Sequence, residues 1–301
     1  MTTTILDVSA AQGVIEWATL AAAGRCDGVI CKATEGAGPY VDPQFDANFS
    51  GAARNALLLG TYHYAHPDES LDDAAIEARH YVSSVLKRAK ANDWTAPLLY
   101  ALDIENARRI RKGPPFVAWC RAFVETIEAM TSLTCWVYTG GPFWDENDGD
   151  IDAESAAFFA ARPLWIAAYV TDPAKWVKMT PWRVVGHALH QWAGDVQPGG
   201  KPGIRYPGIA GNVVDTNRYD GTFAALRGLI GRGAGARDTE PAPAPSSGPP
   251  TWPQTPTSKS SQRLRAVRPE EWSPQTSAHT VLPDIVPAIE DEVDTGGEGD
   301  S

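Results

Sequence analysis

The chain has 301 residues, of which 43% are hydrophobic and 21% charged, so we expect a folded core rather than general disorder. Its formal net charge of −11 argues against nucleic acid as a partner, because phosphate binding depends on clustered lysines and arginines. No apolar stretch approaches the roughly 18–20 residues that are needed to span a membrane, so no membrane insertion is expected.

Short apolar runs alternate with helical patterns along most of the chain. The runs are typical of parallel strands buried on both faces, and they predict strands at 4–8, 28–32, 57–64, 98–104, 134–138, 164–169, 188–192 and 213–217. Helical patterns lie between them at 16–24, 42–56, 70–90, 115–130, 152–161 and 222–229. This order favours the α/β fold class and a (β/α)8-like barrel of the TIM type. The short connections between the later strands predict an incomplete ring of helices.

The composition changes sharply after residue 231. Seven prolines fall between positions 241 and 256, and such a segment cannot bury enough apolar surface to fold. Residues 263–301 carry nine acidic and three basic side chains. We therefore predict a folded domain over 1–231, a proline-rich flexible linker over 232–262, and an acidic, disordered tail over 263–301. We expect the protein to be a monomer.

Two further features concern redox state and export. The cysteines form no C-x-x-C pair and lie beside apolar residues, so we expect reduced, buried thiols at Cys26, Cys31, Cys120 and Cys135. The histidines show no metal-ligand spacing, and we predict neither a metal nor a cofactor. The first residues contain no basic region followed by an apolar one, so we expect synthesis in the cytoplasm without a signal peptide.

Acidic residues stand at the ends of several predicted strands. Asp103 and Glu105 follow the apolar run LLYAL, and positions i and i+2 of a strand face the same side about 6.5 Å apart. Asp7 ends the first strand, and Asp215 lies in the last strand, which neighbours the first in a closed barrel. Barrels of this kind carry their chemistry at the carboxyl ends of the strands, so these four acids should line one cavity. Taken singly, Asp7 and Asp215 are equally consistent with turn or cap positions.

Seven motifs, in order along the chain, resemble those of glycoside hydrolase family 25, the Chalaropsis-type lysozymes of bacteria, fungi and bacteriophages. They are DVSAAQGVIEW at 7–17, KATEG at 32–36, GTYHYA at 60–65, LDIE at 102–105, WIAAY at 165–169, QWAG at 191–194 and VDTN at 214–217. The resemblance implies a muramidase that hydrolyses the β-1,4 bond between N-acetylmuramic acid and N-acetylglucosamine in bacterial peptidoglycan. It also implies catalytic roles for Asp7, Asp103, Glu105 and Asp215.

Glu105 is predicted to be the general acid, because a negative Asp103 beside it would raise its pKa. Asp103 would then orient the 2-acetamido group of the substrate, although an inverting reaction through an activated water is an open alternative. The side chains predicted to bind the sugars are Tyr62, Tyr64, Trp165, Tyr169, Gln191, Trp192 and Asn217. For the two tryptophans, packing in the core is an equal alternative, as is an internal ion pair for Lys32 and Glu35.

Two other functions compete with this hypothesis. A catalytically silent peptidoglycan-binding or virion structural module would share the fold, but such proteins often lose their acids, and all four are present here. An enzyme for another N-acetylated glycan, such as chitin, is the second alternative. With no signal peptide evident, we predict a phage lysin or virion-associated protein that is made in the host cytoplasm and acts at the cell wall.

Overall fold

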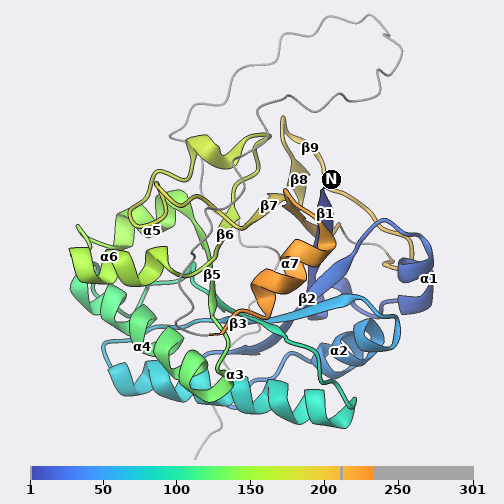
Figure 1. Cartoon of the computed structure of the whole chain (residues 1–301), viewed down its shortest axis with the longest axis horizontal. Helices are drawn as coiled ribbons and strands as arrows, with labels where there is room; N and C mark the ends of the chain where they lie inside the picture. Colours follow the sequence, from blue (N-terminus) through green and yellow to red (C-terminus); the bar gives the residue numbers. More distant parts are fainter. Residues whose placement is uncertain (1, 211–212, 234–301) are drawn as a thin grey trace, which may run out of the picture. The chain divides into compact units, whose positions relative to one another are not determined.

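The computed structural model describes residues 2–210 and 213–233 (Figure 1). The predicted linker and tail lie outside the described residues, except for Arg232 and Gly233. These two residues still pair with the domain, because the backbone N–H of Thr134 donates to the Arg232 carbonyl at 3.1 Å and the Thr134 hydroxyl donates to the Gly233 carbonyl at 3.2 Å. These two residues therefore contact the folded domain, and the predicted division into domain, linker and tail stays a prediction.

Eight strands form a closed barrel, as the alternation of apolar runs predicts (Figure 1). Around the barrel the order is β1-β10-β7-β6-β5-β4-β3-β2, and every neighbouring pair from β1 through β7 is parallel. The strands are β1 Thr3–Val8, β2 Gly28–Glu35, β3 Leu58–Tyr64, β4 Leu99–Asp103, β5 Trp136–Gly140, β6 Leu164–Ala167, β7 Leu189–Ala193 and β10 Asp215–Tyr219.

The last strand corrects the prediction of an all-parallel barrel. β10 runs antiparallel to both β1 and β7, and it begins two residues later than predicted. A parallel return needs a crossover of about a dozen residues or more, usually a helix. Between β7 and β10 the described residues form only the small hairpin of β8 (Val196–Gln197) and β9 (Lys201–Pro202). β10 therefore begins at the end of the barrel where the other strands finish.

Helices cover the outside of the barrel along most of its circumference (Figure 1). The α-helices are α1 Trp17–Ala22, α2 Phe45–Arg54, α3 Leu71–Ala91, α4 Pro114–Thr131, α5 Gly141–Asn147, α6 Ala153–Ala160 and α7 Phe223–Ile230. All six predicted helices are present, and α5 is additional. Among the described residues, β6 and β7 are joined only by the short 3-10 helix η2 (Pro173–Lys175), so the helix ring is incomplete, as predicted. None of the described helices is long and apolar enough to cross a membrane.

Apolar side chains fill the barrel at one end. Ile5, Leu99 and Leu189 face inward from their strands and belong to one buried cluster with Leu226 and Ile230 of α7. Because β10 ends at the amino ends of the parallel strands, α7, which follows it, lies across that end of the barrel. The opposite end, where the parallel strands finish, is left for polar residues.

A larger apolar cluster lies between the strands and the outer helices, and it contains all four cysteines. Each cysteine is buried and free, which confirms the expectation of reduced thiols.

Candidate active site

The predicted acids converge at the carboxyl end of the barrel. Asp7 pairs with Asp215 in the register between β1 and β10, so the antiparallel direction of β10 brings these two carboxyl groups together. Asp103 is the last residue of β4, and Glu105 follows two residues later. Charge interactions link Glu105 to Asp7, Asp103 and Asp215, as expected for one shared site.

Asp7 is the centre of a buried hydrogen-bond network. Its Oδ2 accepts a hydrogen bond from Asn217 Nδ2 at 2.8 Å and another from Gln191 Nε2 at 3.2 Å. The Gln191 Oε1 in turn accepts from the hydroxyls of Tyr138 at 3.0 Å and Tyr169 at 3.2 Å. These bonds hold the Asp7 carboxylate in one orientation, which a reacting group requires.

Asn217 is itself fixed from two sides. Its Oδ1 accepts a hydrogen bond from Trp165 Nε1 at 2.6 Å, and its Nδ2 also donates to the Ile5 carbonyl at 3.1 Å. Trp165 is only 2% exposed, and its ring meets the ring of Tyr138 edge-on at 4.7 Å between centroids. Trp165 therefore lies beneath the acids and presents no open face for a sugar; it positions Asn217.

Burial dominates the electrostatics of the acids. It raises the pKa of Asp7 to about 6, although the hydrogen bonds from Asn217 and Gln191 oppose the shift. Burial also raises the pKa of Asp215 well above its usual value, and the charge of Asp7 adds to the effect. A side-chain hydrogen bond joins these two carboxyls; it lowers the pKa of Asp7 and raises that of Asp215.

Glu105 is half-buried, and its pKa is raised to about 7, first by burial and then by the negative charge of Asp7, while Lys32 opposes the shift. From the sequence, the charge that raises the pKa of Glu105 was predicted to be that of Asp103. In the structure, Asp103 is 5% exposed, and burial followed by the charge of Glu105 raises the pKa of Asp103 well above its usual value. The charge that raises the pKa of Glu105 is therefore that of Asp7. The Asp103 Oδ1 has no hydrogen-bond partner among the described residues.

The remaining predicted sugar-binding residues divide into two groups. Tyr64 at the end of β3 and Tyr169 after β6 are half-buried near the acids, whereas Tyr62 is 6% exposed and packs edge-on against Trp165. Trp192 follows Gln191 in β7, and successive side chains of a strand point to opposite faces. Because Gln191 faces the barrel interior, Trp192 faces outward, away from the acids.

Two further site residues have roles that only the structure reveals: Gly194, which lies in the QWAG motif, and Tyr138, which lies outside the seven motifs. A Cβ on Gly194 would lie 2.5 Å from Asp215 Oδ1 and 2.8 Å from the Tyr169 hydroxyl, so glycine is required there. Tyr138, on β5, pairs in register with Asp103 and bonds Gln191. An inward position at the end of a predicted strand was the available signal for Tyr138.

Lys32 and Glu35 form the ion pair that the sequence analysis offered as one interpretation. The Lys32 ammonium lies 2.6 Å from Glu35 Oε2 and 5.0 Å from the centre of the Tyr64 ring, and Lys32 is 2% exposed. Its charge lowers the pKa of both Asp103 and Glu105. Lys32 is thus a buried cation whose charge acts on the acids of the site.

Comparisons with known proteins agree with the motifs. The family model for glycosyl hydrolases family 25 matches residues 6–200. The N,O-diacetylmuramidase of Chalaropsis sp is 30% identical over 193 residues, 59% of this chain and 85% of that protein. Lysozyme M1 of Streptomyces globisporus is 26% identical over 231 residues, 74% of this chain and 70% of that protein.

Among solved structures, the family GH25 lysozyme from Aspergillus fumigatus superposes with a TM-score of 0.58 at 25% identity, covering 76% of this chain and 99% of that one. The family model spans well over half of the 301 residues. The chain belongs to glycosyl hydrolase family 25 and is a glycoside hydrolase.

Proposed function

We propose that this enzyme is a muramidase that hydrolyses the β-1,4 bond between N-acetylmuramic acid and N-acetylglucosamine in bacterial peptidoglycan, with Glu105 as the general acid. Relatives named as muramidase and lysozyme support peptidoglycan as the substrate. The observation that carries the role of Glu105 is its half-buried position beside the acid cluster with a pKa of about 7. A general acid works best when its pKa lies near the working pH.

Asp103 is proposed to orient the 2-acetamido group of the sugar whose bond is cleaved. Asp103 ends β4 two residues before Glu105, and its Oδ1 has no hydrogen-bond partner among the described residues. The acetamido oxygen would then attack the anomeric carbon while Glu105 protonates the leaving oxygen. Water would open the resulting ring, and Glu105 would accept its proton.

Asp7 is proposed to stabilise the positive charge that develops on the sugar, with Asp215 donating a hydrogen bond to it. Tyr64 and Tyr169 border the same site and are proposed to contact the sugar rings or the acetamido group. The inward-facing Tyr62, Gln191 and Asn217 support this surface from within the barrel.

Mass spectrometry of the fragments released from purified walls tests the bond. Reducing-end muramic acid is expected, whereas reducing-end glucosamine would contradict the proposal. Digestion of chitin in parallel tests the alternative substrate. Proton NMR of the first product tests the mechanism: a retained β anomer is expected for attack by the acetamido group, and an α anomer would indicate direct inversion by water.

The proposal that the protein is a phage lysin or virion-associated enzyme has a separate test. Cells that express it without a permeabilising agent should stay intact and should lyse when their membrane is permeabilised. Lysis without permeabilisation would contradict a route that depends on membrane damage.

A further inference from the structure

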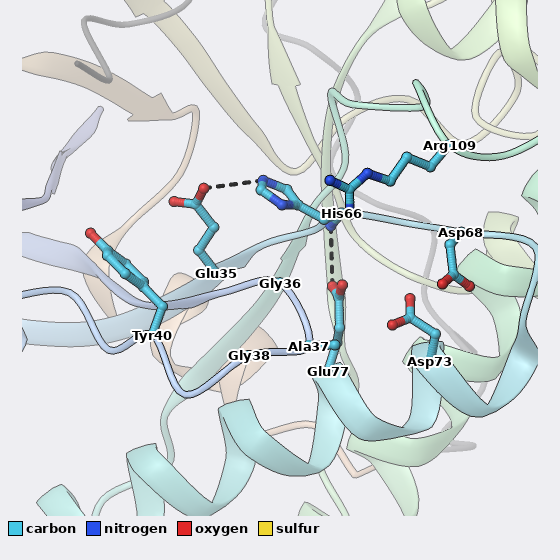
Figure 2. A pocket seen from close by; sticks show the side chains of 10 residues that line it. All are labelled: Glu35, Gly36, Ala37, Gly38, Tyr40, His66, Asp68, Asp73, Glu77 and Arg109. Carbon is cyan, nitrogen blue, oxygen red and sulfur yellow. Dashed lines mark hydrogen bonds and ion pairs between the residues drawn. The ribbon is translucent and has the colours of Figure 1, made fainter. Parts of the chain in front are cut away.

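A cavity of about 320 Å³ is lined by none of the four acids and has no part in the mechanism above (Figure 2). It is bounded by the segments after β2 and β3 and by the first turns of α3, and its size is at the lower end of the range for small-molecule sites. Glu35 connects it to the barrel, because one oxygen of its carboxylate pairs with Lys32 and the other with His66 at 3.1 Å. The charged side chains in its wall are Glu35, His66, Asp68, Asp73, Glu77 and Arg109.

The inner part of the cavity has one polar atom without a partner. Glu77 is fully buried, and its Oε2 accepts hydrogen bonds from His63 Nε2 at 2.8 Å and from the His66 backbone at 3.2 Å. Its Oε1 has no partner among the described residues. Figure 2 shows the carboxyl groups of Glu77, Asp73 and Asp68 directed toward the same space. An unsatisfied carboxylate oxygen in a cavity wall is costly, and a bound donor would remove that cost.

The acidic side chains that line the cavity favour a positively charged hydrogen-bond donor as its ligand. Four acidic side chains face Arg109 and His66, and His66 is already paired with Glu35. Burial raises the pKa of Asp73 to about 6 and that of Glu77 to about 7, although the charge of His66 opposes the shift at Glu77. The described residues contain no group of three or more ligands arranged for a metal ion, whereas an ammonium needs only scattered acceptors for its three N–H donors.

We propose that this cavity binds a primary ammonium group of the substrate, with Glu77 and Asp73 as its acceptors. The inference rests on the proposed function. Peptidoglycan can present such a group from the diamino acid of its peptide or from a glucosamine that lacks its acetyl group. Either group would hold the glycan strand beside Glu105 without contacting the bond that is cleaved.

The first test compares two neighbouring substitutions on α3 in the full chain. Asp73→Asn removes a charge from the cavity wall and keeps an oxygen that accepts the Trp119 hydrogen bond. Asp72→Asn removes the same charge from the same helix turn, but Asp72 is exposed and lies outside the wall. On soluble glycan fragments with free amines, Asp73→Asn should raise KM about tenfold and leave kcat unchanged, and Asp72→Asn should change neither. Equal KM values for the two variants would overturn the proposal.

The second test needs no variant. Acetylation of the amines in the fragments should raise the KM of the wild-type enzyme by a similar factor and abolish the difference between the wild type and Asp73→Asn. Removal of the peptides with an amidase identifies the source: the effect disappears if the amine belongs to the peptide and persists if it belongs to glucosamine. A wild-type KM that is insensitive to acetylation contradicts the proposal. Failure of the muramidase function is distinct, because the wild type would then release no reducing-end muramic acid from either fragment.

Discussion

The interior of the barrel has two halves that are built from the same strands. At one end, Ile5 and Leu189 face inward and form an apolar cluster with Leu226 of α7. Two residues further along the same strands, Asp7 and Gln191 face the same interior and bond each other. One pleat, about 6.6 Å of strand, separates the apolar half from the reactive half.

The comparison shows how stability and chemistry are divided within one fold. The apolar half stabilises the barrel by burial, at about 25 cal/mol per Å² of apolar surface removed from water. The polar half buries carboxyl groups and raises the pKa of Asp7 to about 6 and that of Glu105 to about 7. Substitutions in the polar half should therefore lower activity, whereas substitutions in the apolar half should lower stability.

The largest expected effect lies in the reactive half. Glu105→Gln keeps the size and polarity of the side chain but removes the transferable proton, so kcat on purified walls should fall by about 10²–10⁴-fold. Because the folded-state pKa of Glu105 is raised, the variant should unfold at the same temperature as the wild type below pH 4.5 and should be the more stable of the two near neutral pH. Glu146→Gln is the control, because Glu146 is exposed and paired with Lys112. Near-normal turnover by Glu105→Gln would transfer the acid role to Asp7 or Asp215.

The apolar half should respond in the opposite way. Leu226 is 1% exposed, so Leu226→Ala should leave a cavity against the barrel and lower the free energy of unfolding by about 2–5 kcal/mol. Chemical denaturation measures this, with Leu71→Ala as the control, since Leu71 is 54% exposed. The pH–rate profile of the folded variant should match the wild type. A shifted profile would mean that the two halves are coupled.

Asp103→Asn tests the division between the reactive and the apolar half more sharply, because this one substitution is expected to lower activity and to raise stability. The folded-state pKa of Asp103 is raised above 3.8, so its contribution to stability is fully present below pH 3.8 and is lost as the pH rises. An asparagine stays neutral throughout. The variant should therefore unfold at the same temperature as the wild type near pH 3.5 and should be more stable by about 0.5–2 kcal/mol at pH 7.5. A stabilisation that is independent of pH would contradict this origin.

The smallest predicted effect is a shift of the pH profile. The negative charge of Asp7 raises the pKa of Glu105, so Asp7→Asn should lower that pKa. Glu105 must be protonated to act, and its alkaline loss of activity should consequently move to lower pH, whatever happens to the maximal rate. Asp46→Asn, an exposed change on α2, is a control for net charge. An unchanged alkaline limb would show that burial alone sets the pKa of Glu105.

The local sequence pattern determined the positions of the strands and of the acidic residues at their ends. Continuous apolar runs are strong signals for buried strands, and all eight predicted strands are present within a few residues of their predicted positions. The position of Asp103 at the end of LLYAL indicated its place at the mouth of the barrel, and the pairing of Asp7 with Asp215 followed from barrel closure. Hydrophobic periodicity carries this information because each strand must bury its own side chains.

Only the tertiary structure decided the direction of β10, the support that Trp165 gives to Asn217, and the charge that acts on Glu105. An apolar run gives the same signal for a parallel and for an antiparallel strand. The direction of β10 follows from the connection before it, which contains the hairpin of β8 and β9. Hydrogen bonds and charges act between residues that are close in space, such as Asp7 and Asn217, which are 210 positions apart in the chain. Their effects depend on distance and burial, which exist only after the barrel has closed.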